Sequence, residues 1–376
     1  MLSQPPVWLI LLAFVCALGP LVFIHEMGHY LVARWFGVGA ETFSIGFGKE
    51  ITGWTDKRGT RWKVGWLPLG GYVKFIGDEH EASAPGDVSK LSPEDRARSF
   101  HLKPVWQRFL IVLAGPVSNF LLAIAIFAIF FAAFGAPRTP PVAGAIQAGS
   151  AAEAARIQPG DRILSIGGRE TPTFEELRSY AVMRPGEVVT VRFERESRIH
   201  EVRVTLGTET EEDRFGQSYK RGLLGVSPVG AVFEPVPALQ LVPSATAYVV
   251  KLTRTMLDAL WQIITGRRSV KELGGPLKIA QVAGQQASLG WLPFFWLMTV
   301  VSINLGFINL LPIPLLDGGH LLFYAIEGVR RKPLKPEAQE WAFRTGLAVL
   351  LALMIFVTFN DLASFGLFTK LGGLIG

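Results

Sequence analysis

The most constraining feature of this sequence is an apolar run from about Trp8 to Val32 that contains two histidines and a glutamate. About 25 mostly apolar residues are enough to span the ~30 Å hydrocarbon layer of a membrane. On a helix, His25 and His29 share a face and can reach one metal ion, with Glu26 beside them, which is the H-E-x-x-H pattern of zinc hydrolases. A packed, hydrogen-bonded histidine is the common alternative. In hydrocarbon, however, each ionisable group costs on the order of 2 to 3 kcal/mol, so their presence there favours a functional metal site.

Composition indicates a mixed architecture, with 49% hydrophobic residues among 376. The net charge of +6 could suggest a nucleic-acid partner. The basic residues cluster beside apolar segments, however, and the positive-inside rule explains them more simply, so no nucleic-acid binding is expected. The single cysteine, Cys16, lies in the first apolar run, which excludes a disulfide framework and a cysteine metal site.

The runs long and apolar enough to span predict a polytopic α-helical membrane protein with four transmembrane helices. They are Trp8–Val32, Val105–Phe134, Trp291–Leu311 and Trp341–Phe359. A fifth segment, Leu241–Ile264, carries charges on one helical face and is expected to lie in the membrane interface rather than span. The connections after the first and third runs are rich in Lys and Arg, which predicts that they are cytoplasmic and that both termini are periplasmic.

The connection after the first run contains the pattern of a β-hairpin. Arg61–Trp66 alternates polar and apolar residues, Pro68–Gly71 is expected to turn, and Tyr72–Phe75 resumes the strand. A strand tethered so near the membrane could pair with a substrate strand at its edge, although an ordinary surface hairpin is the alternative. Residues 77–103 are polar and are interpreted as a mobile cytoplasmic loop.

A small soluble α/β unit is expected between Pro140 and Gly207. Phe174–Met183 predicts a short amphipathic helix, and Val188–Phe193 and Val202–Leu206 alternate as strands. The pattern resembles a PDZ domain, with Gln147–Ala152 near the peptide groove. Residues 208–235 carry Glu211, Glu212 and Asp213 and two prolines, and they are interpreted as a linker.

These observations predict the following domain organisation. It consists of the first transmembrane helix at 1–36, a cytoplasmic loop with a membrane-associated hairpin at 37–103, the second helix at 104–135, a periplasmic PDZ domain at 138–208, a linker and interfacial helix at 209–290, the third helix at 291–326, a cytoplasmic loop at 327–340, and the fourth helix with the tail at 341–376.

A catalytic zinc generally takes three protein ligands, so the two histidines require a third. Near the end of the third run, Pro312 and Pro314 stop the helix and are followed by Asp317. Four spans return Asp317 to the side of the membrane where the histidines lie. His320, three residues later, is a competing ligand, although a supporting or packing role is preferred.

The sequence resembles the site-2 protease family of intramembrane zinc metalloproteases, and within it the bacterial group of regulator-of-sigma-E-like proteases. The resemblance is carried by HEMGH, PLGGYVKF, AGPVSN, the PDZ-like insert and NLLPIPLLDGGH, and it covers essentially the whole chain. It implies one zinc ion held by His25, His29 and Asp317, with Glu26 activating water. It further implies that Asn309 holds the substrate backbone. The insert has room for one PDZ domain, whereas some such proteins have two. The hairpin residues expected to contact substrate are Val64, Gly65, Trp66, Tyr72 and Val73.

The implied activity is hydrolysis of peptide bonds within the transmembrane segments of single-span proteins, such as anti-sigma factors or signal-peptide remnants. Another protease of the site-1 type would cut first, and the PDZ domain would admit the trimmed substrate. The enzyme would lie in the bacterial inner membrane, in contact with the lipid bilayer, with its site towards the cytoplasm. A catalytically silent scaffold and a transporter are the alternatives, but all four site residues are present and no inverted repeat is visible.

Overall fold

The computed structural model describes residues 5–79, 89, 91–212, 218–266, 274–332, 334 and 336–364. The chain divides into two compact units. The first, called the helical unit, comprises residues 1–127, 246–258 and 269–376. The second, called the β unit, comprises residues 128–245 and 259–268.

Four helices among the described residues are long and apolar enough to cross a membrane, in agreement with the sequence analysis. They are α1 (Val7–Trp35), α3 (Val105–Phe134), α8 (Trp291–Asn309) and the stretch Gln339–Leu362 within α10 (Pro336–Ser364). Helix α7 (Pro276–Ser288) packs on α1, where Gly284 lies against Ile10. The buried Asp361 of α10 accepts hydrogen bonds from the backbone N–H groups of Gly275 and Lys278 at the start of α7.

Helix α6 (Leu241–Ile264) is not among the helices that meet the criteria for a span. Its Tyr248 makes edge-to-face contacts with Phe127 of α3 and Trp296 of α8, at centroid distances of 5.0 and 5.9 Å. Further along the helix, Trp261 is exposed. The expectation that α6 lies in the membrane interface stays a prediction.

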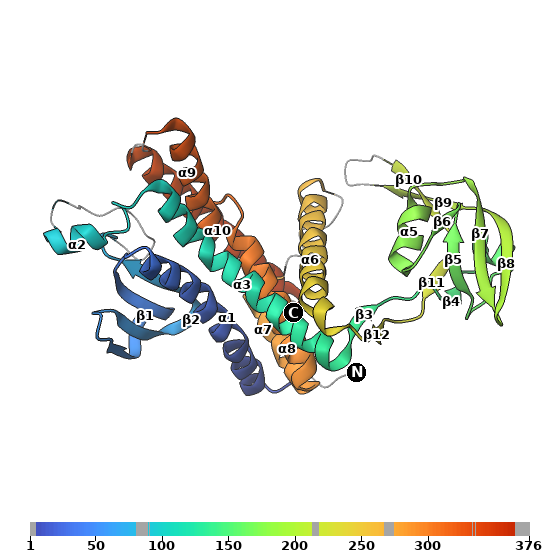
Figure 1. Ribbon diagram of the computed structural model, residues 1–376, viewed down its shortest axis with the longest axis horizontal. Helices are drawn as coiled ribbons and strands as arrows, with labels where there is room; N and C mark the ends of the chain where they lie inside the picture. Colours follow the sequence, from blue (N-terminus) through green and yellow to red (C-terminus); the bar gives the residue numbers. More distant parts are fainter. Residues whose placement is uncertain are drawn as a thin grey trace, which may run out of the picture. The chain divides into compact units, whose positions relative to one another are not determined.

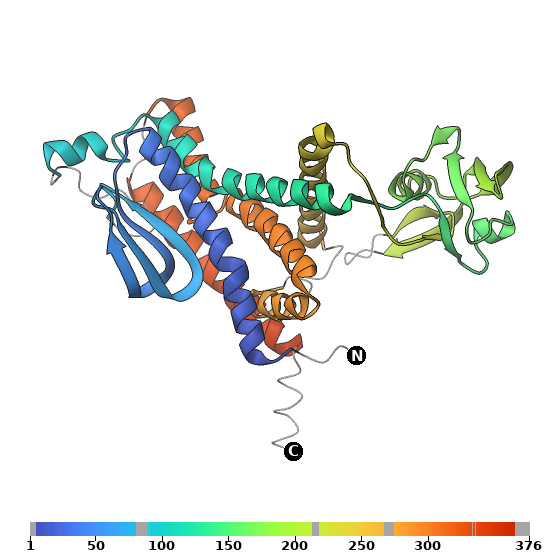
Figure 2. The ribbon, with the colours of Figure 1, turned by 60° about the horizontal axis from the view of Figure 1, so that its bottom comes forward.

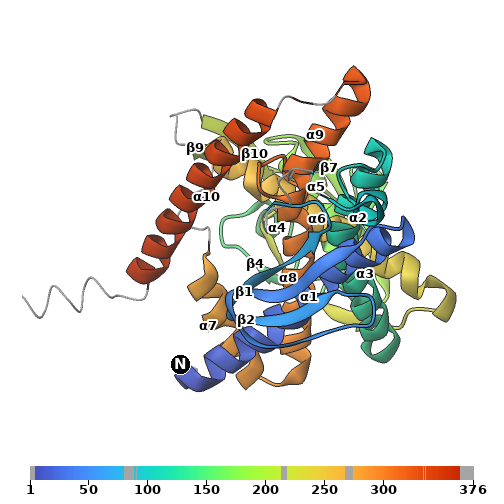
Figure 3. The ribbon, with the colours of Figure 1, turned by 90° about the vertical axis from the view of Figure 1, so that its left-hand side faces the viewer.

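A long two-stranded sheet follows α1, formed by β1 (Ala40–Thr55) and β2 (Arg61–Phe75), which lies beside α1 (Figures 2 and 3). The turn is at residues 56–60, where the Asp56 carboxylate accepts hydrogen bonds from the N–H groups of Arg58 and Thr60. The predicted hairpin turn at Pro68–Gly71 is therefore wrong, because β2 continues through it. The partner strand β1 was missed because its three glycines hide the alternation of polar and apolar residues.

The two strands bend so that they form more than one ladder. Residues 42–45 of β1 pair with 61–64 of β2 on one side and with 71–74 of β2 on the other. Residues 61–64 also pair with 52–55. Val64 therefore has neighbours on both sides, whereas Gly71–Phe75 forms an edge of the sheet, called the edge segment below.

Beneath this sheet lies the main core of the helical unit. Phe43, Val73 and Phe75 from the sheet pack with Tyr30 of α1 and Phe100. Phe100 follows the short helix α2 (Pro93–Arg98), which lies within the expected loop at 77–103. Residues 80–88 and 90 of that loop lie outside the described residues. The core holds the edge segment against α1.

Between α8 and α9 (Asp317–Arg330) the chain makes a tight connection. Leu315 adopts a positive φ of 80°, which is unfavourable for a branched side chain. A Cβ on Gly318 would lie 2.2 Å from the carbonyl oxygen of Leu311, so only glycine fits there. Backbone strain and close packing thus fix Asp317 as the first residue of α9.

The β unit contains a four-stranded sheet in the order β6-β5-β7-β8, with α5 packed on it (Figure 1). The bounds are β5 Arg162–Ile166, β6 Arg169–Glu170, α5 Phe174–Val182, β7 Val188–Arg195 and β8 Arg198–Thr205. Smaller elements are β3 Ala136–Arg138, β4 Ala143–Ile146, α4 Ala151–Ala154, β9 Gly207–Glu212, β10 Ser218–Leu223, β11 Val226–Pro228, β12 Val232–Glu234 and the 3-10 turn Ala238–Gln240.

The β unit extends beyond its predicted end at residue 208. Strand β11 pairs with β4, and Leu224 is buried in the core with Leu206 and Phe174. Residues 209–212 and 218–228 are therefore part of the fold rather than a linker. Their largely charged and polar sequence concealed this, because only a few of these residues enter the core.

One buried ion pair anchors the sheet of the β unit. Asp161 is 1% exposed and accepts hydrogen bonds from the Arg195 guanidinium at 2.6 and 2.7 Å and from the N–H of Gln158 at 2.7 Å. Burial raises the pKa of Asp161, but these hydrogen bonds outweigh it and hold the pKa below its ordinary value.

Candidate active site

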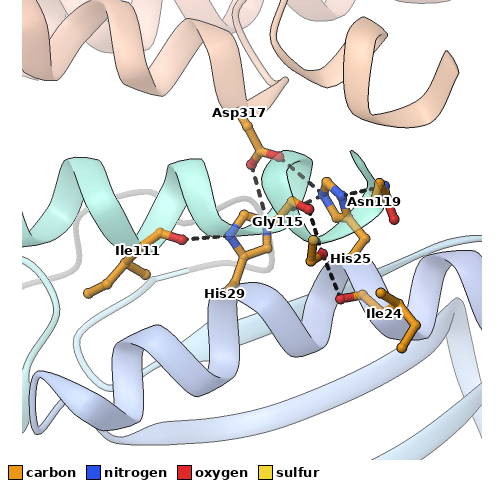
Figure 4. Close-up of polar contacts among 8 residues, drawn as sticks. Ile24, His25, His29, Ile111, Gly115, Asn119 and Asp317 are labelled. Atoms are coloured by element: carbon orange, nitrogen blue, oxygen red, sulfur yellow. Dashed lines mark hydrogen bonds and ion pairs between the residues drawn. The ribbon is translucent and has the colours of Figure 1, made fainter. Parts of the chain in front are cut away.

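The predicted metal ligands come together although they lie at opposite ends of the chain. Nε2 of His25 is 3.1 Å from Oδ2 of Asp317, and Nε2 of His29 is 3.5 Å from Oδ1 of the same carboxylate. The two Nε2 atoms are 3.3 Å apart. In Figure 4 both imidazoles rise from α1 towards Asp317, which descends from the start of α9. The histidines are 7% and 8% exposed, so the three groups meet away from solvent.

The donor set fits a zinc ion. Two imidazole nitrogens and one carboxylate oxygen lie within 4.8 Å of one another, and zinc binds these atom types with a fourth position left for water. Two Nε2 atoms that face each other across 3.3 Å also need a shared cation or proton between them. Of the described residues, no other group of three or more His, Cys, Asp and Glu side chains has this geometry.

Each imidazole is held through its second nitrogen. Nδ1 of His29 donates to the carbonyl oxygen of Ile111, at 2.9 Å, which leaves Nε2 directed at Asp317. Nδ1 of His25 lies 3.0 Å from the amide nitrogen Nδ2 of Asn119, which is fully buried (Figure 4). Binding a metal through Nε2 puts the proton on Nδ1, and the Asn119 amide, turned by 180°, then presents as acceptor its oxygen Oδ1, which has no partner among the described residues.

Helices α1 and α3 approach closely because each presents a glycine to the other. A Cβ on Gly28 would lie 2.4 Å from the carbonyl oxygen of Ala114, and one on Gly115 would lie 2.1 Å from Nε2 of His29. The Ser118 hydroxyl donates to the carbonyl oxygen of Ile24, at 2.8 Å. The sequence motif AGPVSN in this part of α3 did not by itself predict the roles of Asn119 and Gly115. An asparagine inside an apolar run was the available signal.

A cavity of about 380 Å³ opens on the metal ligands. Glu26, 8% exposed, lines it beside the histidines. A Cβ on Gly71 would lie 3.0 Å from Cγ of Glu26, so the edge segment runs directly beside this carboxylate. A general base next to a metal site and a strand edge is the arrangement needed to hydrolyse an extended peptide.

Of the residues predicted to contact substrate, three line this cavity and three do not. Asn309, Tyr72 and Val73 line it. Val64, Gly65 and Trp66 are not among its lining residues, because they belong to the inner part of β2 and Trp66 is 63% exposed.

His320 also lines the cavity but lies outside the close cluster of metal-binding atoms. Its ring packs near Tyr324 and Phe343, at centroid distances of 6.4 and 5.2 Å. The described geometry thus favours a packing or supporting role for His320 over a ligand role.

A metal-binding hydrolase site on helices apolar enough to span defines the class of protein as a membrane metalloprotease, and the comparisons with known proteins agree. The model of peptidase family M50 matches residues 13–353. A protein named as a zinc metalloprotease, Atu1380 of Agrobacterium fabrum, is 43% identical over 369 residues, covering 93% of this chain and 95% of the relative. Metalloprotease MmpA of Caulobacter vibrioides is 38% identical over 391 residues, covering 97% and 98%.

The chain belongs to peptidase family M50, and the resemblance to the site-2 protease family is confirmed. It is a zinc metalloprotease with membrane-spanning helices. Among solved structures, the PDZ domain of the SdrC-like protein from Listeria monocytogenes matches 23% of this chain and 85% of that chain at 17% identity. Its TM-score is 0.19, too low to bear on the fold of the β unit.

Proposed function

We propose that this enzyme hydrolyses peptide bonds within the transmembrane segments of single-span membrane proteins, after a first cut by another protease. The observation that carries the proposal is the convergence of His25, His29 and Asp317 within 4.8 Å on helices apolar enough to span. Anti-sigma factors and signal-peptide remnants are the expected kinds of substrate. A soluble substrate would have no reason to meet a site on such helices.

The proposed chemistry divides between one metal ion and one carboxylate. A single zinc ion at these ligands would polarise the scissile carbonyl and make water a better nucleophile near neutral pH. Glu26 takes the proton from that water and then gives it to the leaving amine. Its position beside the histidines in the cavity supports this role.

A helical substrate must unwind before it can be cleaved, because its carbonyls are engaged in i to i−4 hydrogen bonds. The edge segment offers replacement partners, since it lines the cavity and pairs with β1 along one side only. Asn309 lines the same cavity from the end of α8 and could bind another part of the unwound strand. Residues of weak helix propensity in the span would lower the cost of unwinding.

The central test compares the wild-type protein with Glu26→Gln on a labelled single-span substrate in proteoliposomes. The variant should lose cleavage while it keeps bound zinc, because Gln retains the shape but not the base. Cleavage by Glu26→Gln near the wild-type rate would refute the assignment.

Strand pairing is tested by Val73→Pro, which removes a backbone donor from the edge segment. Cleavage should fall strongly at unchanged zinc content, whereas Val73→Thr, which keeps the backbone, should be mild. Normal cleavage by Val73→Pro would make this edge purely structural. Val64→Pro is not an equivalent test, since Val64 is paired on both sides.

We propose that the β unit is a PDZ domain that binds the new C-terminus left by the first cut. A cavity of about 230 Å³ lies between α5 and the segment Arg221–Pro228. Leu177 and Ala181 make it apolar, and Arg178 offers a positive charge for a carboxylate. The groove was expected near Gln147–Ala152, none of which lines this cavity. A peptide with an apolar C-terminus should bind and its C-terminal amide should not; equal binding of the two would contradict carboxylate recognition.

The proposed topology places both termini and the β unit in the periplasm of a bacterium, with the metal site towards the cytoplasmic side of the inner membrane. The Lys and Arg residues near 34–103 and 327–335 support it through the positive-inside rule. In a Cys16→Ala background, single cysteines at Glu94 and Lys332 should label from the cytoplasm and one at Glu170 from outside. Labelling of position 332 from outside would overturn this topology.

A further inference from the structure

A hydrogen bond just after the end of the edge segment shows to which side each of its residues directs its backbone N–H and C=O groups. The N–H of Ile76 donates across the sheet to the carbonyl oxygen of Gly39, at 2.9 Å. Successive residues of a strand direct their backbone groups to opposite sides, so those of Phe75 point away from β1. The same alternation directs the backbone groups of Val73 and Gly71 outward, to the side where an added strand would pair.

Both outward groups of Phe75 are already engaged, and both by Asp78. The N–H of Phe75 donates to Oδ2 of Asp78, at 2.9 Å, and its carbonyl oxygen accepts from the N–H of Asp78, at 3.1 Å. Two residues of a paired strand exchange the same two hydrogen bonds. Asp78 therefore substitutes for the next residue of an added strand. The turn that brings it back requires Gly77, whose φ is +97°.

Asp78 is fixed in this position from the other side. Its Oδ1 lies 2.7 Å from Nε2 of His101, and its side chain is fully buried. The neighbouring Phe100 lines the catalytic cavity, stacks on Phe75 with a centroid distance of 5.2 Å, and donates its N–H to the carbonyl oxygen of Ile76, at 3.1 Å. Phe75, whose outward backbone groups are occupied by Asp78, is thus part of the cavity wall together with Phe100.

We propose that Asp78 is a positioning residue that ends the substrate ladder at Val73 and so sets which peptide bond meets Glu26. This inference rests on the proposed pairing of substrate with the edge segment. Strand register changes in steps of two residues if the same side chains are to face the same way. A substrate free to bond Phe75 as well could therefore pair two residues further along, and a different bond would lie at the site.

The test uses the full-length enzyme, a labelled single-span substrate and mass spectrometry of the products. Asp78→Ala frees the Phe75 N–H and should add a second cleavage product, displaced by two residues from the wild-type one, with zinc content unchanged. Asp78→Leu fills the buried space with a side chain of similar shape. It should therefore give the same second product even if the smaller alanine of Asp78→Ala destabilises the turn. Asp78→Asn is the matched control, because its amide can bond both Phe75 and a neutral His101, and it should give the wild-type product alone.

Hydrogen exchange tests, without substrate, whether Asp78 occupies the backbone N–H of Phe75. The Phe75 amide should exchange with deuterium slowly in the wild type and in Asp78→Asn, and faster in Asp78→Ala. Wild-type products alone from both apolar variants, or complete loss of cleavage by them with zinc retained, would overturn the proposal. If wild type cleaves and Glu26→Gln does not, such a result rejects the register role while the proposed protease activity stands.

Discussion

Gly115 of α3 is the residue at which the smallest possible change should disable the metal site. A Cβ at this position would lie 2.1 Å from Nε2 of His29 and 2.4 Å from its Cε1. The side chain of His29 cannot simply turn away, because its Nδ1 is bonded to the carbonyl oxygen of Ile111 and its Nε2 faces Asp317. In Gly115→Ala the added methyl group and the imidazole of His29 cannot both occupy these positions, so the zinc ligand must move.

The size of the effect follows from the distances. Cβ atoms essentially never come within 3.0 Å of a heavy atom, so Nε2 of His29 must retreat by about 0.9 Å. Zinc–ligand distances in proteins vary by only about 0.2 Å around their ideal values. Loss of a supporting group already costs about 10- to 100-fold in metal affinity, so displacement of a ligand should cost on the order of 100-fold or more. Helix stability should not fall, because alanine is favoured over glycine by about 1 kcal/mol.

Zinc affinity is measured by competition with a chelator in detergent, and cleavage of the single-span substrate is measured alongside. Gly19→Ala is the matched control, because it lies in α1 and a Cβ there meets nothing within 4 Å. It should leave zinc binding and cleavage at wild-type values. Wild-type zinc affinity in Gly115→Ala would refute the assignment of His29 as a ligand in this geometry.

Three further results are expected. Asp317→Ala should lower zinc content below one ion per chain by metal analysis; full retention would identify another third ligand, with His320 the first to test. Asn119→Leu should weaken zinc binding about 10- to 100-fold by removing the partner of a ligand, with helix content unchanged by circular dichroism; unaltered affinity would assign Asn119 to packing alone. Asp161→Asn should destabilise the β unit by about 1 to 3 kcal/mol near pH 7. Because the folded pKa of Asp161 is depressed, its stabilisation is fully present above the unfolded pKa of about 3.9 and is lost as the pH falls through the folded value. The difference in hydrogen exchange of the sheet amides between wild type and variant, corrected for intrinsic rates, should therefore narrow as the pH falls below about 4; a constant difference would mean that the charge of Asp161 is not the cause.

The metal site could be predicted because its signals are local and carry chemistry. His25 and His29 are one helical turn apart, and Asp317 follows two prolines that must end a helix. The long apolar runs likewise fixed the spans, because length and hydropathy alone decide whether a helix can cross a bilayer.

The sheet and the end of the β unit could not be predicted in the same way. Strand β1 contains Gly46, Gly48 and Gly53, two of which adopt positive φ, and its pairing with two parts of β2 depends on bends that no local pattern specifies. Leu224 closes the core of the β unit from within a polar segment, which only the tertiary contacts disclose. The roles of Asn119 and Asp78 depend on residues distant in sequence and so required the assembled structure.

The origin of the ligands in α1 and α9 has a consequence for the synthesis of the enzyme. A ribosome that adds about 5 to 20 residues per second needs on the order of 15 to 60 seconds to proceed from His29 to Asp317. During that interval the membrane holds a chain with both histidines, Glu26 and the edge segment, but without the third ligand. Two histidines alone leave the metal weakly held and its geometry undefined. Proteolytic competence therefore arises only after α9 has been made and has joined α1, so an unfinished or truncated chain does not threaten the helices that surround it.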